Sequence, residues 1–224
     1  MAPEQKDRSL ARRLAAEHND RGDPLGWFER LYTAAGSDTR LIPWGDMGPN
    51  PNFVGWPGRT CLAGDGQTAL QIGCGLGDDA ECLAAMGFAV TAFDIAPTAI
   101  DWCETRFPAS SVAYELADLF DPPARWAGRF DFVLEVYTLQ SFPRELRPDA
   151  LARIAEFVAP GGDLLIIGRL TDDGAGTDAL PWPLMPSELA PLRDAGLREV
   201  AVEDYTDSED PPVRRVRAHY RRKA

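Results

Sequence analysis

The sequence predicts an α/β protein with a doubly wound, mostly parallel sheet and helices on both faces. The first observation behind this is a strand-like run at residues 68–72 that passes through a glycine-rich turn into a helical segment. The second is that two further strand-like runs follow, each ending at or just before an acidic residue. Parallel strands joined by helices bring such ends to one edge of the sheet, where ligands bind in open α/β folds.

The glycine-rich turn suggests a ligand without identifying it. Residues 68–72 are mainly apolar, which suits a strand buried on both faces. Gly73, Gly75 and Gly77 then allow the backbone to turn sharply beneath a ligand. An ordinary glycine-rich strand-to-helix turn would have the same composition, so the glycines alone do not decide the matter.

The spacing of these glycines separates two classes of cofactor. A dinucleotide motif requires a third glycine three positions after Gly75, and this chain has Asp78 there. A carboxylate at that position would repel a pyrophosphate, whereas it is compatible with a cationic or zwitterionic ligand.

The next two strands place further acids at the same edge. Residues 89–94 end in Asp94, which could accept hydrogen bonds from ribose hydroxyls. Residues 112–116 form a third strand-like run, which is followed by Asp118. Three consecutive strand ends therefore carry the glycine turn, Asp94 and Asp118.

With these motifs, residues 68–168 resemble the class I methyltransferases that use S-adenosylmethionine (SAM). A fourth strand at residues 130–140 and the turn at residues 159–162 also fit that pattern. The resemblance implies a Rossmann-like sheet of seven strands, mostly parallel with an antiparallel last strand. It also implies a methyltransferase whose cofactor is SAM and whose product is S-adenosylhomocysteine.

The resemblance assigns roles to individual residues at the strand ends. In the family the glycine loop lies against the methionine moiety, the acid after strand two holds the ribose, and the acid after strand three meets the adenine amino group. In this chain the cofactor contacts so implied are Gly73, Gly75, Gly77, Asp94, Ile95, Asp118 and Leu119.

The end of strand four is expected to face the transferred methyl group. Glu135 and Tyr137 are therefore the candidate catalytic residues. Tyr137 is also a candidate to contact the methyl acceptor, the substrate that receives the methyl group. Glu135 has three possible roles, which are a general base, a contact to the cofactor's ammonium group and a structural acid.

Residues 1–66 are expected to form a helical and irregular segment that closes over the cofactor, within a single domain whose methyltransferase core spans residues 67–224. Gly26-Trp27, Tyr32 and Pro43-Trp44 resemble the amino-terminal region of the thiopurine and thiol/halide methyltransferase branch. There a tryptophan-bearing segment closes over SAM, so Trp27 and Trp44 are implied cofactor contacts and Tyr32 an acceptor contact. The branch often has Pro-Trp-Asp, and this chain has Gly45 before the aspartate. The alternative is that these aromatic residues simply pack in the core.

The remaining elements are predicted from periodicity and from Pro, Gly and Ser positions. Residues 36–66 are rich in Pro, Gly and Asn and are predicted to be irregular, and Ser9 and Ser187 are candidate helix caps. Residues 169–186 are either a substrate lid, with Arg169 and Trp182 as acceptor contacts, or a glycine-rich connector. Helices are predicted at residues 9–19, from about 24, 78–86, 97–107, 144–158 and 187–195, and a final hairpin at residues 198–205 and 213–220.

Charge and hydropathy restrict the partners of this chain. A formal net charge of −12 argues against a nucleic-acid substrate. The basic residues 214–223 overlap a strand pattern and are predicted to form a solvated edge strand and tail rather than a phosphate site. No apolar run approaches the ~20 residues of a membrane span, and residues 1–8 lack the pattern of a signal peptide, so a cytoplasmic location without membrane association is expected.

The cysteines and histidines bear on the chemistry. Cys61, Cys74, Cys82 and Cys103 have no metal-ligand or disulfide spacing, so neither a metal nor a disulfide is predicted, and Cys74 is expected to be a small filler. His18 and His219 lie outside the strand-end motifs, which favours an acceptor that needs no base, such as a small thiol. Methylation of oxygen, nitrogen or carbon and a non-catalytic SAM-binding protein remain alternatives. The chain could be a monomer or a homodimer.

Overall fold

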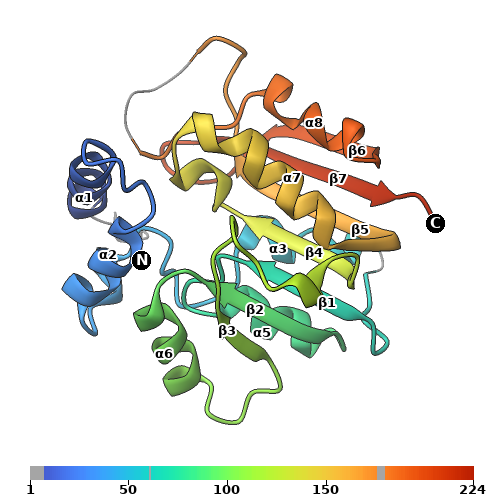
Figure 1. Cartoon of the computed structure of the whole chain (residues 1–224), viewed down its shortest axis with the longest axis horizontal. Coiled ribbons are helices and arrows are strands. Elements are labelled where there is room, and N and C mark those ends of the chain that lie inside the picture. The colour runs from blue at the N-terminus through green and yellow to red at the C-terminus, as the bar shows by residue number, and fades with distance from the viewer. Residues whose placement is uncertain (1–7, 61, 176–179) are drawn as a thin grey trace.

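The fold is a single seven-stranded sheet covered by helices on both faces (Figure 1). The structure is a computed structural model and describes residues 8–60, 62–175 and 180–224. The strand order is β3-β2-β1-β4-β5-β7-β6. The strands are β1 (Thr68–Ile72), β2 (Ala89–Asp94), β3 (Ala113–Leu116), β4 (Phe130–Val136), β5 (Val158–Arg169), β6 (Leu197–Thr206) and β7 (Arg214–Arg222). The predicted fold class is confirmed.

The direction of the strands brings the expected motifs together. β1 pairs in parallel with both β2 and β4, while β3 and β5 extend the parallel region on either side. β7 runs antiparallel to both of its neighbours, β5 and β6. The carboxyl ends of β1 to β5 therefore share one edge, with the glycine loop and Asp94 on neighbouring strands.

Helices cover the two faces according to the alternation of strand side chains. Residues of one parity, such as Leu70 and Val133, pack against α7 and α8. Residues of the other parity, such as Ala69 and Leu134, pack against α3, α5 and α6. The helices of the core are α3 (Pro51–Val54), α4 (Pro57–Thr60), α5 (Asp78–Ala85), α6 (Pro97–Arg106), α7 (Arg147–Phe157) and α8 (Pro191–Asp194).

The amino-terminal helices form a third apolar cluster beside α6 (Figure 1). They are α1 (Ser9–Asn19) and α2 (Trp27–Ala35). Glu29 of α2 accepts hydrogen bonds from the backbone N–H of Thr98 at 3.0 Å and from its hydroxyl at 2.6 Å, at the start of α6. The guanidinium of Arg12 in α1 donates to the carbonyl of Leu180 at 2.8 Å. The segment is thus attached to both α6 and the chain that follows β5.

Several sequence-based expectations differ from the structure in detail. Residues 36–66 are not wholly irregular, because α3 and α4 lie within them and Phe53 and Trp56 join the core. The expected helix at residues 187–195 is split into a 3-10 turn at Pro186–Leu189 and α8, and the Ser187 hydroxyl donates to Asp173 at 2.6 Å instead of capping it. Ser9 lies inside α1 and is not its cap.

The basic carboxyl-terminal run is not an edge strand. β7 lies between β5 and β6, and the side chains of Arg215 and Arg217 are 2% and 7% exposed. Each is paired with an acid, Arg215 with Asp207 at 2.5 Å and Arg217 with Glu203 at 2.8 Å. The charge that resembled a phosphate site is largely neutralised within the sheet. Separately, none of the helices among the described residues has the length and apolar character that a membrane span requires.

Candidate active site

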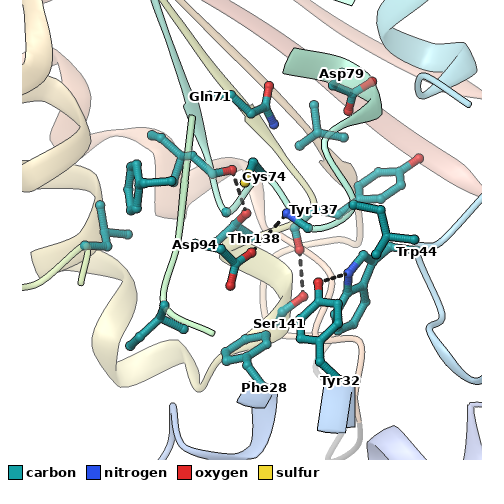
Figure 2. A pocket seen from close by; sticks show the side chains of 18 of the residues that line it. Phe28, Tyr32, Trp44, Gln71, Cys74, Asp79, Asp94, Tyr137, Thr138 and Ser141 are labelled. Atoms are coloured by element: carbon teal, nitrogen blue, oxygen red, sulfur yellow. Dashed lines mark hydrogen bonds between the residues drawn. The ribbon is translucent and has the colours of Figure 1, made fainter. Parts of the chain in front are cut away.

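A pocket opens at the carboxyl edge of the parallel strands (Figure 2). Its walls come from four places, which are the glycine loop after β1, the ends of β2 and β3, the turn after β4, and the amino-terminal segment. Of the residues predicted to bind cofactor or acceptor, it brings together Tyr32, Trp44, Gly73, Gly75, Asp94, Ile95, Asp118, Leu119 and Tyr137.

The glycine loop has left-handed backbone at each glycine, with φ of 57° at Gly73, 55° at Gly75 and 87° at Gly77. A Cβ at Gly73 would lie 2.4 Å from Oγ1 of Thr138, so a side chain there would collide with the turn after β4. Gly77 does not line the pocket, because it faces Tyr114, whose hydroxyl would lie 2.7 Å from a Cβ. Its role is to pack the loop.

Asp94 both faces the pocket and anchors the glycine loop. It is 6% exposed, and its two oxygens accept hydrogen bonds from the backbone N–H groups of Gly75 and Ala96, each at 3.0 Å. Burial raises the pKa of Asp94 to about 6, although these hydrogen bonds oppose the rise. After β3, Asp118 accepts from the N–H of Phe120 at 2.8 Å, and Leu119 continues the wall.

The amino-terminal segment contributes aromatic walls. The indole N–H of Trp44 donates to the hydroxyl of Tyr32 at 2.8 Å, and both residues line the pocket (Figure 2). Burial holds the pKa of Tyr32 well above its usual value, so this hydroxyl stays protonated. Trp27 does not line the pocket. It is fully buried behind Phe28, with ring centroids 4.1 Å apart, and Phe28 takes the pocket position.

The two candidate catalytic residues separate at the end of β4. Glu135 is fully buried and outside the pocket lining, and its Oε1 accepts hydrogen bonds from the N–H groups of Thr138 at 2.6 Å and Leu139 at 3.0 Å. Burial raises the pKa of Glu135 to about 7. Tyr137 has an unusual positive φ of 66° and does line the pocket.

Arg169, at the end of β5, and Trp182, in the loop that follows, were predicted to contact the methyl acceptor. Both residues lie outside the pocket lining. The backbone N–H of Arg169 donates to the side-chain oxygen of Gln140 at 2.7 Å, and that of Trp182 donates to the backbone carbonyl of Gln140 at 2.9 Å. Residues 176–179 of this loop are outside the described part of the chain. The carbonyl of Trp182 also accepts from Arg147 at 2.5 Å, so this end of the loop is fastened to the turn after β4 and to α7.

Residues at one end of the pocket were not singled out from sequence. They are Gln71 on β1, Asp79 in the first turn of α5, and Asn50 before α3. The available signal for Gln71 was a polar residue inside an apolar strand. Cys74 also lines the pocket, and its hydrogen bond to Cys103 and its burial hold its pKa well above the usual value, which fits a filler and not a nucleophile. Cys74, Cys82 and Cys103 are free thiols, while Cys61 lies outside the described residues.

The acidic and aromatic groups that line this pocket suit SAM. Asp94 offers a charged acceptor for a ribose diol, and acidic and aromatic walls are compatible with a sulfonium cation. A family model described as "Methyltransferase domain" matches residues 69–162, the region that holds the glycine loop, both acids and the turn after β4. This protein is a class I SAM-dependent methyltransferase.

The methyltransferase is similar to proteins that act on different small molecules. It is 26% identical to a 2-heptyl-1-hydroxyquinolin-4(1H)-one methyltransferase of Mycobacteroides abscessus over 77% of this chain and 72% of that protein. It is 26% identical to the probable thiol methyltransferase 2 of Arabidopsis thaliana over 89% and 84%. Its fold matches the 1,6-didemethyltoxoflavin-N1-methyltransferase of Burkholderia thailandensis with bound S-adenosylhomocysteine, with a TM-score of 0.68, 20% identity, and coverage of 94% and 91%.

Proposed function

We propose that this methyltransferase methylates a small thiol or another soft nucleophile without an obligatory protein base. The observation that carries this proposal is the orientation of Glu135, which lies outside the pocket lining and whose Oε1 accepts hydrogen bonds from the backbone of the turn after β4. Both histidines are paired elsewhere, His18 with Asp23 and His219 with Asp163. A thiol with a pKa of ~8.5 is already partly ionised at neutral pH and needs little assistance.

The walls on the amino-terminal side of the pocket support a soft acceptor. Phe28, Tyr32 and Trp44 present aromatic surface there, and their rings contact one another. Bound SAM supplies an electrophilic methyl group on a sulfonium. The aromatic residues would exclude water and hold the acceptor in line with that group, which is the main task for a displacement of this kind.

The remaining assignments form part of the same proposal. Gly73 and Gly75 approach the methionine moiety, Asp94 with Ile95 binds the ribose, and Asp118 with Leu119 receives the adenine. Residues 1–66 close over the cofactor through Trp44 and Tyr32. Trp27 supports this wall from behind, and Gly77 supports the loop.

A panel of acceptors tests the proposal. S-adenosylhomocysteine formation would be measured with thiols, phenols, amines and halides, for the wild type and for Glu135→Gln at saturating SAM. We expect turnover with at least one thiol, retained within about tenfold in Glu135→Gln, whereas loss of a general base lowers rates by ~10²–10⁴-fold. A loss beyond a hundredfold on every acceptor, with cofactor affinity unchanged, would refute the base-free mechanism.

A second candidate is methylation of oxygen or nitrogen on a flat heteroaromatic compound. The aromatic side chains on one side of the pocket favour such an acceptor. The names of the quinolinone and didemethyltoxoflavin methyltransferases point to acceptors of this kind in similar proteins. The same panel separates the two, because a heteroaromatic substrate would be turned over and small thiols would not. Cofactor binding without turnover of any acceptor in the panel would contradict both candidates.

A further inference from the structure

Arg169, the last residue of β5, is a partly buried arginine whose guanidinium has no partner among the described residues. Only its backbone N–H makes a hydrogen bond, to the side chain of Gln140. Arg8 is the other such case. The remaining arginines that the structure describes as partly or fully buried each donate to a carboxylate or to a backbone carbonyl. A guanidinium taken partly out of water without a counter-charge is unfavourable, so an anion is the partner that Arg169 lacks.

Arg169 lies next to Arg215, on the face of the sheet where Tyr137 packs. β5 and β7 run side by side (Figure 1), and Arg169 and Arg215 are directly opposite each other in their antiparallel pairing. Side chains in such a pair project from the same face. The guanidinium of Arg215 lies 5.0 Å from the ring centroid of Tyr137, whose backbone N–H donates to the carbonyl of Ile167 on β5 at 3.0 Å. Because Tyr137 lines the pocket, the two arginines lie just outside this part of its wall.

The charge of Arg215 is neutralised, whereas that of Arg169 is not. Arg215 is paired with Asp207 at 2.5 Å and also with Glu209. Burial lowers the pKa of Arg169, and the positive charges of Arg8 and Arg215 lower it further, although Glu209 opposes them. Since Arg215 already engages Glu209, positive charge is in excess around Arg169.

The start of α1 contributes the second cation. Arg8 immediately precedes α1, and one turn later the guanidinium of Arg12 donates to the carbonyl of Leu180 at 2.8 Å. This end of α1 therefore lies against the chain that follows β5. Arg8, like Arg169, forms no ion pair with a described residue.

The chemistry of this position favours a carboxylate. The planar fork of a guanidinium matches the two oxygens of a carboxylate, to which it can donate two parallel hydrogen bonds. The net charge of −12 disfavours the approach of a polyanion such as a nucleic acid. A small molecule with a single negative charge meets both conditions.

We propose that the methyl acceptor carries a carboxylate and that Arg169 binds it. The atom that receives the methyl group lies in the pocket, and the carboxylate extends past the ring of Tyr137 to the guanidinium. A second point of attachment would restrict the acceptor to orientations in line with the methyl group, which favours the displacement. The inference rests on the proposed methylation of a small acceptor and specifies its charge, whichever atom is methylated.

Matched pairs of acceptors test this inference in the full-length protein. Benzenethiol and phenol would each be compared with their ortho, meta and para carboxylic acids, by S-adenosylhomocysteine formation at saturating SAM. We expect at least one of these acids to have a kcat/KM about tenfold or more above that of its neutral parent. Arg169→Gln should lower kcat/KM for that acid by about ten- to a hundredfold, as for loss of a charge-assisted hydrogen bond, and leave the neutral parent within about twofold.

Two further variants make the test specific. Arg169→Lys keeps the charge and loses the fork, so kcat/KM for the acid should fall by less than in Arg169→Gln and by more than for the neutral parent. Arg153→Gln is the matched control, because it removes one positive charge from an exposed position on α7. It should leave every acceptor within about twofold. Calorimetric binding of S-adenosylhomocysteine verifies that each variant is folded.

The outcomes separate failure of this inference from failure of the proposed function. If Arg169→Gln and Arg169→Lys lower the acid and its neutral parent equally, or lower neither, Arg169 does not bind a carboxylate, although thiol methylation can still stand. An equal loss in Arg153→Gln would show a general effect of charge and would also overturn the inference. Arg169-dependent turnover of hydroxybenzoates without turnover of any thiol would support the inference and refute the soft acceptor. Turnover of no acceptor would overturn both.

Discussion

Glu135 should make the stability of this protein depend on pH in a way that one substitution removes. Burial raises the pKa of Glu135 from its ordinary 4.5 to about 7, against the opposing hydrogen bonds of Leu139 and Thr138 and the charge of Arg147. The folded state therefore keeps this proton to a higher pH than the unfolded state. It follows that the free energy of unfolding falls as the pH rises from about 4.5 to 7. The difference between the two pKa values corresponds to roughly 3 kcal/mol.

Urea denaturation of the wild type and of Glu135→Gln at pH 5 and pH 8 measures this contribution. Glutamine cannot ionise, so the stability of the variant relative to the wild type should improve by roughly 2–3 kcal/mol between pH 5 and pH 8. Asp79 and Asp94, whose pKa values are also raised to about 6, are present in both proteins and cancel in the difference. A relative stability that stays the same at both pH values would refute the placement of Glu135 as a buried acid.

Three further predictions concern the pocket. Gly73→Ala should greatly reduce cofactor binding, because its Cβ would lie 2.4 Å from the side-chain oxygen of Thr138 after β4. Gly128→Ala is the control, because Gly128 has a similar φ of 60° but no atom within 4 Å of its Cβ position. This control should bind the cofactor normally and lower the free energy of unfolding in urea by only about 1 kcal/mol. For 5′-methylthioadenosine, affinity of the wild type should fall as the pH drops below about 6 and Asp94 gains a proton, and calorimetry should find this dependence absent in Asp94→Asn. Trp44→Ala should lower turnover at least tenfold by opening the pocket wall, while Trp27→Phe, which changes a residue behind that wall, should lower thermal stability and leave turnover within about threefold. Equal effects within either glycine or tryptophan pair, or an unchanged pH dependence in Asp94→Asn, would contradict the corresponding prediction.

The elements that depend on local sequence could be predicted closely. β2 begins after a glycine and ends at Asp94 as expected, because an alternating apolar run between turn signals is a local property. The position of β7 could not be predicted in this way. Strand order depends on pairing between distant residues, and Arg215 and Arg217 are buried only because acids of the same hairpin neutralise them.

In the pocket, too, the residues that depend on local sequence could be predicted, and those that depend on packing between distant elements could not. Gly73, Gly75 and Asp94 line the pocket as expected, because each lies at or just after the carboxyl end of a parallel strand, whereas Gly77 does not line it. Whether Trp27 or Phe28 lines the pocket depends on which face α2 turns toward it. The packing of α2 against α6 determines that orientation, and the local sequence does not reveal it.

Glu135 was expected to face the transferred methyl group, but its Oε1 turns back to the backbone of Thr138 and Leu139, and this contact depends on the path of the chain after β4. Tyr137 follows the last residue of β4 and has a positive φ, so strand alternation does not determine the direction of its side chain, which lines the pocket.

The position of the cofactor is the claim on which the other assignments depend, and a crystal structure with S-adenosylhomocysteine measures it directly. We expect the ribose hydroxyls within hydrogen-bond distance of Asp94, the adenine beside Asp118 and Leu119, and the methionine moiety against Gly73 and Gly75. A ligand bound outside this pocket, or lying in it with its adenine against Gly73 and its methionine moiety at Asp118, would contradict these assignments.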